Sequence, residues 1–435
     1  MSLDNDMKIS SVPPGRDYSV SQSDANLFVK AYHPNTNYVV TPICEGSDTL
    51  FYIYNFLPEG WLIVAGDRRI DPIIGESLVG NWDIDVESEA RSEVISSILE
   101  LYEEECSLAA DNEHTRFWNT ISKKNPLTDV KSIHTKNNGM KWCVVRTLDR
   151  IRSSYEDVIP HLIQTKWGQS SPWNYKLPID LSSQEENKRC YIGCTSVAVS
   201  QMIFYLHNYL HKPNGLYHNI SCNESILSKT SAIGFSRSEY VSNSTRWEQM
   251  PLDSNGNNIS YVTDLMLDVG NRLVTKYSAS GSSASVTSDK ISYYNLSLSS
   301  SIYKESIVRA NLNSNLPVII VASDRDNTYA HAWIIDGIRK RRSIYTYSCH
   351  VEYSENWQGE PEYYDTFDAV RNRYHINDEY DVWEENTSTT TEHYLMNWGY
   401  DGRYDEDIYT MYGPGTWVVG PNSYVKNKQI YYDFR

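Results

Sequence analysis

The sequence predicts an α+β protein, and three observations support this fold class. Near the N-terminus, one helical pattern precedes two short apolar strands. In the second half, the run GCTSVAVSQMIFYLHNYL is apolar on nearly all faces, as a central buried helix would be. Several apolar strands follow this run. A helix followed by a strand-rich half is an α+β layout rather than a series of βα units.

Composition limits the possible functions. The chain has 435 residues, enough for two or three domains, and its 40% hydrophobic content is ordinary for a globular protein. The net charge of −17 argues against nucleic acid and anionic membranes as partners. We find no apolar run long enough to span a bilayer and no visible signal peptide. The polar start MSLDNDMKIS leads us to expect that a targeting segment has been removed.

The first 118 residues are predicted to form a small α+β unit. In SVSQSDANLFVKAYH, serines can cap a helix that places Ala25, Phe28, Val29 and Tyr32 on one face. TLFYIYNF and GWLIVAGD are apolar strands separated by the turn LPEG, which predicts a hairpin. The later run SEARSEVISSILELYEEECSLAA predicts an acidic amphipathic helix.

Residues 119–155 are basic, polar and turn-rich, which predicts an exposed linker that can also be cleaved. Residues 156–435 are predicted to form a larger second unit. Its expected elements are the central helix, a second helix ending near Gly270, a hairpin of LPVIIVAS and YAHAWIIDGI, and strands in HYLMNWGYDG and GTWVVG.

A cysteine begins the predicted central helix. The seven cysteines are an odd number without a CxxC pair, so at least one thiol should be free. At a helix N-terminus, unpaired N–H groups and the helix dipole favour the thiolate of Cys194 and lower its pKa. The preceding glycine permits close approach of a substrate. Three interpretations stay open: a nucleophile, a buried structural thiol, and a disulfide with Cys190.

A nucleophilic cysteine needs a base, a group that orients the base, and an oxyanion donor. His331 begins the apolar strand HAWIIDG and lies 137 positions after Cys194, although it could equally be a core histidine. Asn397 offers an amide oxygen to the ring of His331, and Trp398 can shield that hydrogen bond. Gln169 lies upstream of the cysteine, where its side-chain amide could bind an oxyanion. The four elements occur in the order of papain-like enzymes.

The chain resembles streptopain and related bacterial cysteine peptidases, a papain-like group made as zymogens. The resemblance rests on WGQSSPWN, GCTSVAVSQMI, LMLDVG followed by YSASGSSAS, HAWIIDG and NWGYDG, all in family order. In addition, YIYNFLPEGWLIVAGDRRIDPIIGES resembles the inhibitory pro-domain of the family. This resemblance implies a papain-like catalytic domain, a central helix on an antiparallel sheet, preceded by a small α+β pro-domain. The expected protein is a secreted or cell-surface endopeptidase that needs no cofactor or metal.

The resemblance also implies residue roles. Cys194 would be the nucleophile, His331 the general acid/base, Asn397 and Trp398 its orienter and shield, and Gln169 the oxyanion donor. The loop of Ser280, Gly281, Ser282 and Ser283 would line the substrate groove, together with Ala330 beside the histidine. Here the sequence departs slightly, because the family usually has glycine at the position of Ala330. The implied partners are protein or peptide substrates and the chain's own pro-domain as inhibitor.

A larger departure separates the histidine from the asparagine. The family has a short hairpin between them, whereas His331 and Asn397 are 66 positions apart here. We call residues 338–391 the insertion. It is acidic and tyrosine-rich, and we expect it to reshape the substrate groove or to pack over the pro-domain.

Three rival functions remain. An acyltransferase or amidase could use the same residues, because acyl transfer differs only in the acceptor. An inactive peptidase fold could serve as an inhibitor or adhesin, although the intact set of catalytic residues argues against it. The pair His207 and His211 in HNYLH has spacing compatible with metal ligands, but a solvated helix end explains it more simply.

Overall fold

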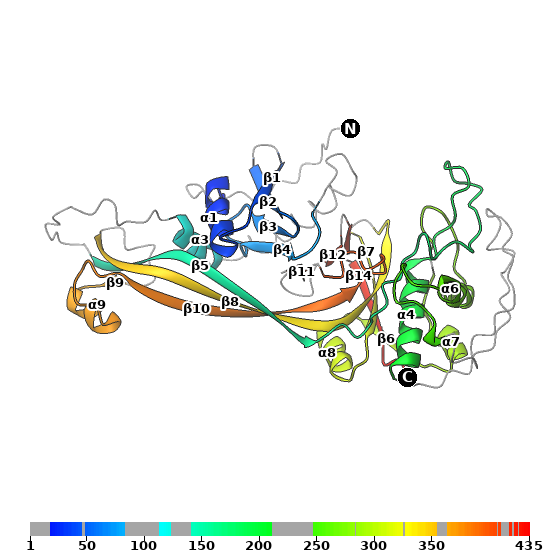
Figure 1. The fold of residues 1–435 in the computed structure, drawn as a ribbon. Coiled ribbons are helices and arrows are strands. Elements are labelled where there is room, and N and C mark those ends of the chain that lie inside the picture. Colours follow the sequence, from blue (N-terminus) through cyan, green and yellow to red (C-terminus); the bar gives the residue numbers. More distant parts are fainter. Residues whose placement is uncertain are drawn as a thin grey trace. The chain divides into compact units, whose positions relative to one another are not determined.

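The computed structural model describes residues 18–45, 48–82, 113–122, 141–210, 247–282, 284–324, 327–354, 363–406, 408–409, 417–419, 422–424 and 426–435. These residues divide into two compact units. The first contains the described residues of Met1–Asp83, Ile95–Glu156 and Lys340–Thr391. The second contains those of Asp157–Arg339 and Glu392–Arg435. Both units combine helices and strands, so the predicted α+β class is confirmed (Figure 1).

The first unit begins with the predicted helix and hairpin. Helix α1 (Gln22–Tyr32) is capped by Ser21, whose side chain accepts a hydrogen bond from the Asp24 N–H group. Strands β1 (Tyr38–Glu45), β2 (Asp48–Phe56), β3 (Trp61–Ala65) and β4 (Ile73–Ser77) form consecutive antiparallel pairs. The buried face of α1 packs with β2 and β3 in one apolar cluster.

Later parts of the chain complete the first unit. They are helix α3 (Glu113–Ser122), most of strand β5 (Lys141–Ile159), the second half of β8 (Ala330–Ser354), strand β9 (Tyr363–Tyr364), helix α9 (Phe367–Tyr374) and the start of β10 (Trp383–Asn397). Strand β8 neighbours β5 and β10, and β5 neighbours β9. A second apolar cluster joins Trp142 and Val144 to Tyr347, Val351 and α9.

The second unit contains the predicted central helix and its sheet. Helix α4 (Cys194–Asn208) packs against α6 (Ile259–Leu273), while β6 (Ser299–Ile302), β14 (Lys426–Tyr432), β7 (Val318–Ser323) and the start of β8 lie in that order in a sheet. Strand β14 pairs antiparallel with β6 and β7, and β7 pairs antiparallel with β8. The remaining short elements are α7 (Ser288–Ile291), η3 (Ser292–Tyr294), α8 (Glu305–Asn313), β11 (Ile408–Tyr409), β12 (Trp417–Val419) and β13 (Asn422–Tyr424).

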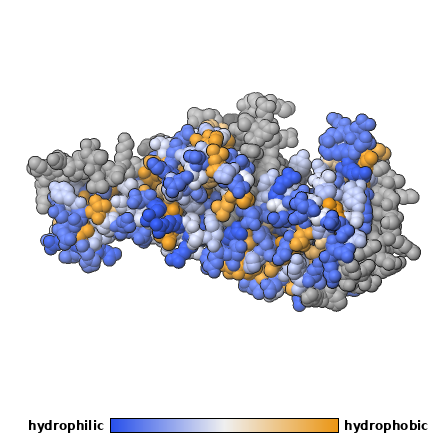
Figure 2. Space-filling model, in the orientation of Figure 1, coloured by the Kyte–Doolittle hydropathy of each residue, from blue (hydrophilic) through white to orange (hydrophobic). Residues whose placement is uncertain are grey.

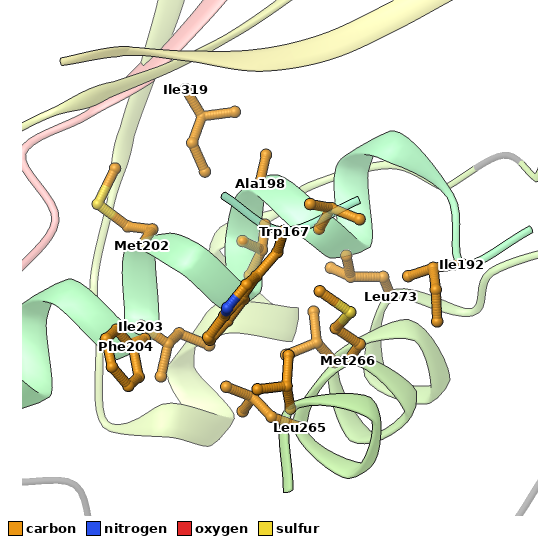
Figure 3. Packing of buried hydrophobic residues seen from close by; sticks show 14 of the residues in the cluster. Trp167, Ile192, Ala198, Met202, Ile203, Phe204, Leu265, Met266, Leu273 and Ile319 are labelled. Carbon is orange, nitrogen blue, oxygen red and sulfur yellow. The ribbon is translucent and has the colours of Figure 1, made fainter. Parts of the chain in front are cut away.

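The core of the second unit lies between α4 and its neighbours. Met202, Ile203 and Phe204 of α4 pack with Trp167 and Met266, as Figure 3 shows. The same cluster includes Ile319 of β7, so α4 packs on the sheet as predicted. Twelve residues of α4 are buried, which explains why its sequence is apolar on nearly all faces.

The predicted linker is partly wrong. Lys141–Ile159 is strand β5, in which Trp142 and Val144 are buried in one cluster of the first unit and Ile151 in the other. Residues 119–122 belong to α3. The rest of the predicted linker, residues 123–140, and the predicted acidic helix at 88–110 lie outside the described residues.

The surface of the described residues is mixed. Figure 2 shows small apolar groups scattered among hydrophilic residues on the face that it presents. Among the described helices, none is long and apolar enough to cross a membrane. The described residues contain no group of three or more histidine, cysteine or acidic side chains that could hold a metal ion. His207 stacks on Trp247, with ring centroids 4.4 Å apart, whereas His211 lies outside the described residues.

Candidate active site

Cys194 is the first residue of α4, as predicted. Cys194 is a half-buried residue with a free thiol, and the buried Cys190 is also free, so the disulfide interpretation is wrong. The backbone of Ala332, which follows His331 on β8, lies close enough to the Cys194 sulfur to lower the pKa of the thiol. This contact brings the start of the central helix to the strand that carries the histidine.

Gly193 allows the loop 278–282 to lie beside the cysteine. Its φ of 94° favours glycine, and a Cβ atom there would lie 3.2 Å from both the Cβ and the carbonyl oxygen of Ser282. The Ser282 hydroxyl donates to the carbonyl of Tyr191 at 2.7 Å, and the Tyr191 N–H donates to the carbonyl of Ser278 at 3.0 Å. These contacts connect the loop to the residues that lead into α4.

Asp180 holds the same loop from the other side. Its carboxylate accepts hydrogen bonds from the Ala279 N–H at 2.8 Å and the Ser278 hydroxyl at 3.3 Å. Hydrogen bonds from the Ala279 N–H and from Ser182 lower the pKa of Asp180 to about 2. Ser280 and Gly281 remain exposed at the tip of the loop, whereas Ser283 lies outside the described residues.

Gln169 lies next to the segment that enters α4. Its carbonyl accepts a hydrogen bond from the Ile192 N–H at 2.9 Å, two residues before the cysteine. The preceding Gly168 has no room for a Cβ atom, which would lie 2.4 Å from the Asp401 carboxylate. Asp401 in turn accepts a hydrogen bond from the Trp173 indole at 2.5 Å. Gln169 is therefore held by backbone contacts close to Cys194.

His331 is buried in an aromatic environment. Its Nε2 lies 2.9 Å from the carbonyl oxygen of Trp398, so Nε2 carries the proton and donates it. The Tyr400 ring stacks parallel to the imidazole, with centroids 4.8 Å apart and the hydroxyl oxygen 3.5 Å from Nδ1. Trp398 and Tyr424 also stack with the imidazole, which shields it from water. Ala330, immediately before it, is exposed.

Asn397 has contacts that differ from the expectation. Its amide oxygen accepts a hydrogen bond from Gln201 Nε2 at 2.9 Å, and its Nδ2 donates to the carbonyl of Thr165 at 2.8 Å. The amide oxygen expected to orient His331 is thus bonded to α4 instead. The imidazole Nε2 of His331 donates instead to the backbone carbonyl of Trp398, which takes the orienting place expected for Asn397.

Trp398 is positioned by a buried carboxyl group. Its N–H donates to Asp405 at 2.9 Å, and its own carbonyl accepts from His331. Burial raises the pKa of Asp405 to about 7. Asp405 and His331 thus bind the same residue: Asp405 accepts from the N–H group of Trp398, and His331 donates to its carbonyl, which fixes the tautomer of the imidazole.

The ionisation of the two main groups also differs from the expectation. Burial raises the pKa of the Cys194 thiol, although hydrogen bonds from Ala332 and Thr195 offset part of the rise. Burial lowers the pKa of the His331 imidazole to about 4. The predicted low thiol pKa is therefore wrong for this structure, because desolvation outweighs the helix N-terminus. Burial therefore favours the uncharged form of both groups.

The second unit brings together the described site residues that the sequence singled out: Gln169, Cys194, Ser282, His331 and Trp398 are joined through the contacts given above. The sequence did not indicate Asp180, Gln201, Tyr400 or Asp405. Only Tyr400 and Asp405 carried a signal, their closeness in sequence to Asn397 and Trp398.

A free thiol at a helix N-terminus, a strand histidine beside it and a nearby glutamine define a thiol-dependent acyl-transfer site. Residues 167–409, more than half of the chain, match the Peptidase C10 family. The chain therefore belongs to this family and is a cysteine peptidase.

The chain is also similar to the following proteins. Streptopain from Streptococcus pyogenes serotype M28 is 24% identical over 320 residues, which cover 67% of this chain and 69% of streptopain. A solved fragment of prointerpain A from Prevotella intermedia gives a TM-score of 0.48 at 15% identity, covering 91% of this chain and 98% of that one. Active interpain A from the same organism gives 0.39 at 18% identity, covering 63% and 94%.

Proposed function

We propose that the chain is the latent form of an endopeptidase in which Cys194 is the nucleophile and His331 the general acid/base. The observation that carries the proposal is the contact between the Cys194 sulfur and the backbone of Ala332, next to His331. It brings a free thiol at a helix N-terminus to the strand of the only site histidine in the described residues.

In the proposed reaction, His331 accepts the thiol proton and the sulfur attacks the peptide carbonyl. The tetrahedral oxyanion accepts hydrogen bonds from the Gln169 side chain and from backbone N–H groups at the start of α4. As the C–N bond breaks, His331 returns the proton to the leaving amine and a thioester remains. Water then attacks the thioester, passing a proton through His331 back to the sulfur and releasing the acid.

Asn397 and Trp398 would position the imidazole during these steps. For Asn397 this needs a change of partner, because its amide oxygen bonds Gln201 here. Asn397 lies beside Trp398, whose carbonyl already binds the ring, so a small shift of the imidazole would suffice. The loop Ser280–Ser282 and Ala330 are proposed to contact the substrate, since both lie next to the catalytic pair and are partly exposed.

Latency has two supports in the site. First, burial favours the neutral form of both Cys194 and His331, whereas a thiolate is the nucleophile that the reaction needs. Second, the imidazole of His331 donates to the carbonyl of Trp398 and not to the amide oxygen of Asn397. Residues 1–118, part of which resemble an inhibitory pro-domain, are proposed to be the inhibitor. A latent form protects the producing cell, so we propose that the enzyme acts after secretion or at the cell surface.

Labelling with a thiol-directed epoxide tests the nucleophile. We expect one adduct, on the peptide that contains Cys194, once the enzyme has been activated with reductant. Cys194→Ala should lose both labelling and casein hydrolysis, while Cys44→Ala, which changes an exposed thiol, should keep both. Hydrolysis by the Cys194→Ala protein above a tenth of the wild-type rate would refute the assignment. Incorporation of an added amine in place of hydrolysis would indicate an acyltransferase.

A further inference from the structure

The insertion and strand β5 share a core with the N-terminal residues. Ile151 of β5 is buried in the same cluster as Phe28, Trp118 and Val64, and Tyr345 of the insertion packs against that cluster. The Phe117 and Tyr345 rings meet edge to face, with centroids 5.5 Å apart. All of these residues belong to the first unit.

A buried ion pair connects the same two parts of the chain. Arg341 of the insertion donates to Glu76 of β4 at 2.7 Å, and their side chains are only 4% and 6% exposed. The second oxygen of Glu76 accepts a hydrogen bond from the Tyr32 hydroxyl at 2.7 Å. The glutamate is thus satisfied by one partner from α1 and one from the insertion.

Strand β5 adds polar contacts at the same place. Ser153 and Tyr155 of β5 both influence the pKa of Tyr32, so their side chains lie near its hydroxyl. The Ser153 and Ser343 hydroxyls lie 2.9 Å apart and join β5 to β8. Burial, with a smaller contribution from Glu76, raises the pKa of Tyr32 well above its ordinary value, so its hydroxyl stays protonated and donates.

These contacts join residues on opposite sides of the linker that we expect to be cleaved, of which residues 123–140 remain after the assignment of α3 and β5. We call the part of the chain up to residue 122 the N-terminal fragment and the part from residue 141 the C-terminal fragment. Tyr32, Glu76 and Phe117 belong to the first, whereas Ser153, Arg341 and Tyr345 belong to the second. A cut within residues 123–140 would break no contact described above.

We propose that β5 and the insertion strand of β8 form a docking surface for the N-terminal fragment, which stays bound after the chain is cut. Arg341 is its central anchor, because an uncompensated buried Glu76 would be costly. Cleavage and release are then separate events, and the cut enzyme keeps its inhibitor until the fragment dissociates or is degraded. The position of the cut and the continued inhibition of the cut enzyme rest on the proposed function, whereas the docking surface does not.

The test uses full-length Cys194→Ala protein with the recognition sequence of an unrelated protease placed within residues 123–140. After complete cutting, gel filtration at micromolar concentration should show both fragments in one peak, separating only in urea. Separation without denaturant would overturn the proposal. Because an unrelated protease makes the cut, the result is independent of whether Cys194 is a catalytic nucleophile.

Two arginine variants identify the anchor. Arg341→Met should weaken the complex of the cut fragments by on the order of a hundredfold, since it leaves Glu76 buried without its cation. Arg146→Met is the matched control, because Arg146 pairs with Glu385 at 2.8 Å and both residues lie in the C-terminal fragment. It should leave the affinity within a few-fold of the parent. Equal effects of both variants would contradict the role of Arg341.

Glu76→Gln provides a second variant, in which the new side chain has the same size and shape as the glutamate. It keeps an oxygen for Tyr32 but removes the charge that binds Arg341, so it should weaken the complex at least tenfold. Circular dichroism of the uncut proteins checks that each variant is folded. A Glu76→Gln complex as tight as the parent, with folded protein, would show that apolar contacts alone hold the fragment.

Discussion

Individual contacts decide the state of the catalytic pair. His331 donates to a backbone carbonyl, and Asn397 bonds Gln201 rather than the imidazole. Both arrangements satisfy buried polar groups, which are costly when unpaired. The residues of the proposed mechanism are thus present, but their partners are those of a resting site.

Substitutions of His331 and of Asn397, its proposed orienting residue, should reduce the rate of hydrolysis to different extents. His331→Ala should abolish hydrolysis, whereas Asn397→Ala should reduce kcat but leave measurable activity, because the nucleophile and base remain. Steady-state kinetics on the activated enzyme provide the comparison. If Asn397→Ala were more damaging than His331→Ala, the asparagine would have a role other than orientation.

The reactivity of the thiol should change on activation. In the intact chain burial raises the pKa of Cys194, so alkylation should be slow at pH 7 and accelerate only as the pH rises above about 8.5. After activation the profile should move to lower pH, and His331→Ala should prevent this movement. Alkylation rates measured against pH, before and after cutting, would reveal it; identical profiles for both forms would argue against an ion pair with His331.

Asp405 should make stability depend on pH. Its pKa is raised to about 7, so between about pH 4 and pH 7 the unfolded chain is ionised while the folded chain is protonated. The folded protein is therefore not penalised by Asp405 at low pH, and its free energy of unfolding falls as the pH rises from about 4 to about 7. Asp405→Asn should therefore raise the free energy of unfolding by on the order of 2 kcal/mol at pH 8 and little at pH 4. Urea denaturation at the two pH values measures this, and a gain that is equal at both would contradict it.

At the scale of elements, the insertion provides buried partners for the first unit. Tyr347, Cys349, Val351 and Val370 form an apolar cluster with Trp142 of β5. We expect the insertion either to reshape the substrate groove or to pack over the pro-domain. The second expectation agrees with the first unit, which contains both Lys340–Thr391 and Met1–Asp83. Whether it also shapes the substrate groove stays a prediction.

Replacing residues 340–391 by a short turn should loosen the first unit and leave the second folded. The reason is that the change removes Arg341 from Glu76 and Tyr345 from the N-terminal cluster. Hydrogen exchange should show faster exchange in α1 and β2, with α4 still protected. Unfolding of α4 as well would show that the insertion belongs to the core of the second unit.

At the scale of the whole molecule, we expect the full-length chain to be latent and to mature by a cut within residues 119–155, and specifically between 123 and 140. Helix α3 and strand β5 occupy the rest of the range 119–155, and hydrogen-bonded helices and strands are poor protease substrates. Cys194→Ala protein should stay uncut until active enzyme is added. Mass spectrometry of the new N-terminus checks the position, and full activity of an intact chain would refute latency.

The sequence by itself determined the elements and the order of the chemical groups. Helix α1, the hairpin β2–β3, helix α4 and the pair β7–β8 follow from local periodicity, which depends on neighbouring residues alone. For the same reason the position of Cys194 at a helix start could be predicted.

Only the tertiary structure decided which groups meet. Glu76 and Arg341 are 265 positions apart, and Gln201 and Asn397 are 196 apart, so no local pattern connects them. Strand β5 looked like a linker because its buried residues find their partners in distant segments. The pKa values of Cys194 and His331 were likewise fixed by burial, a property of packing that outweighs the local effect of the helix N-terminus.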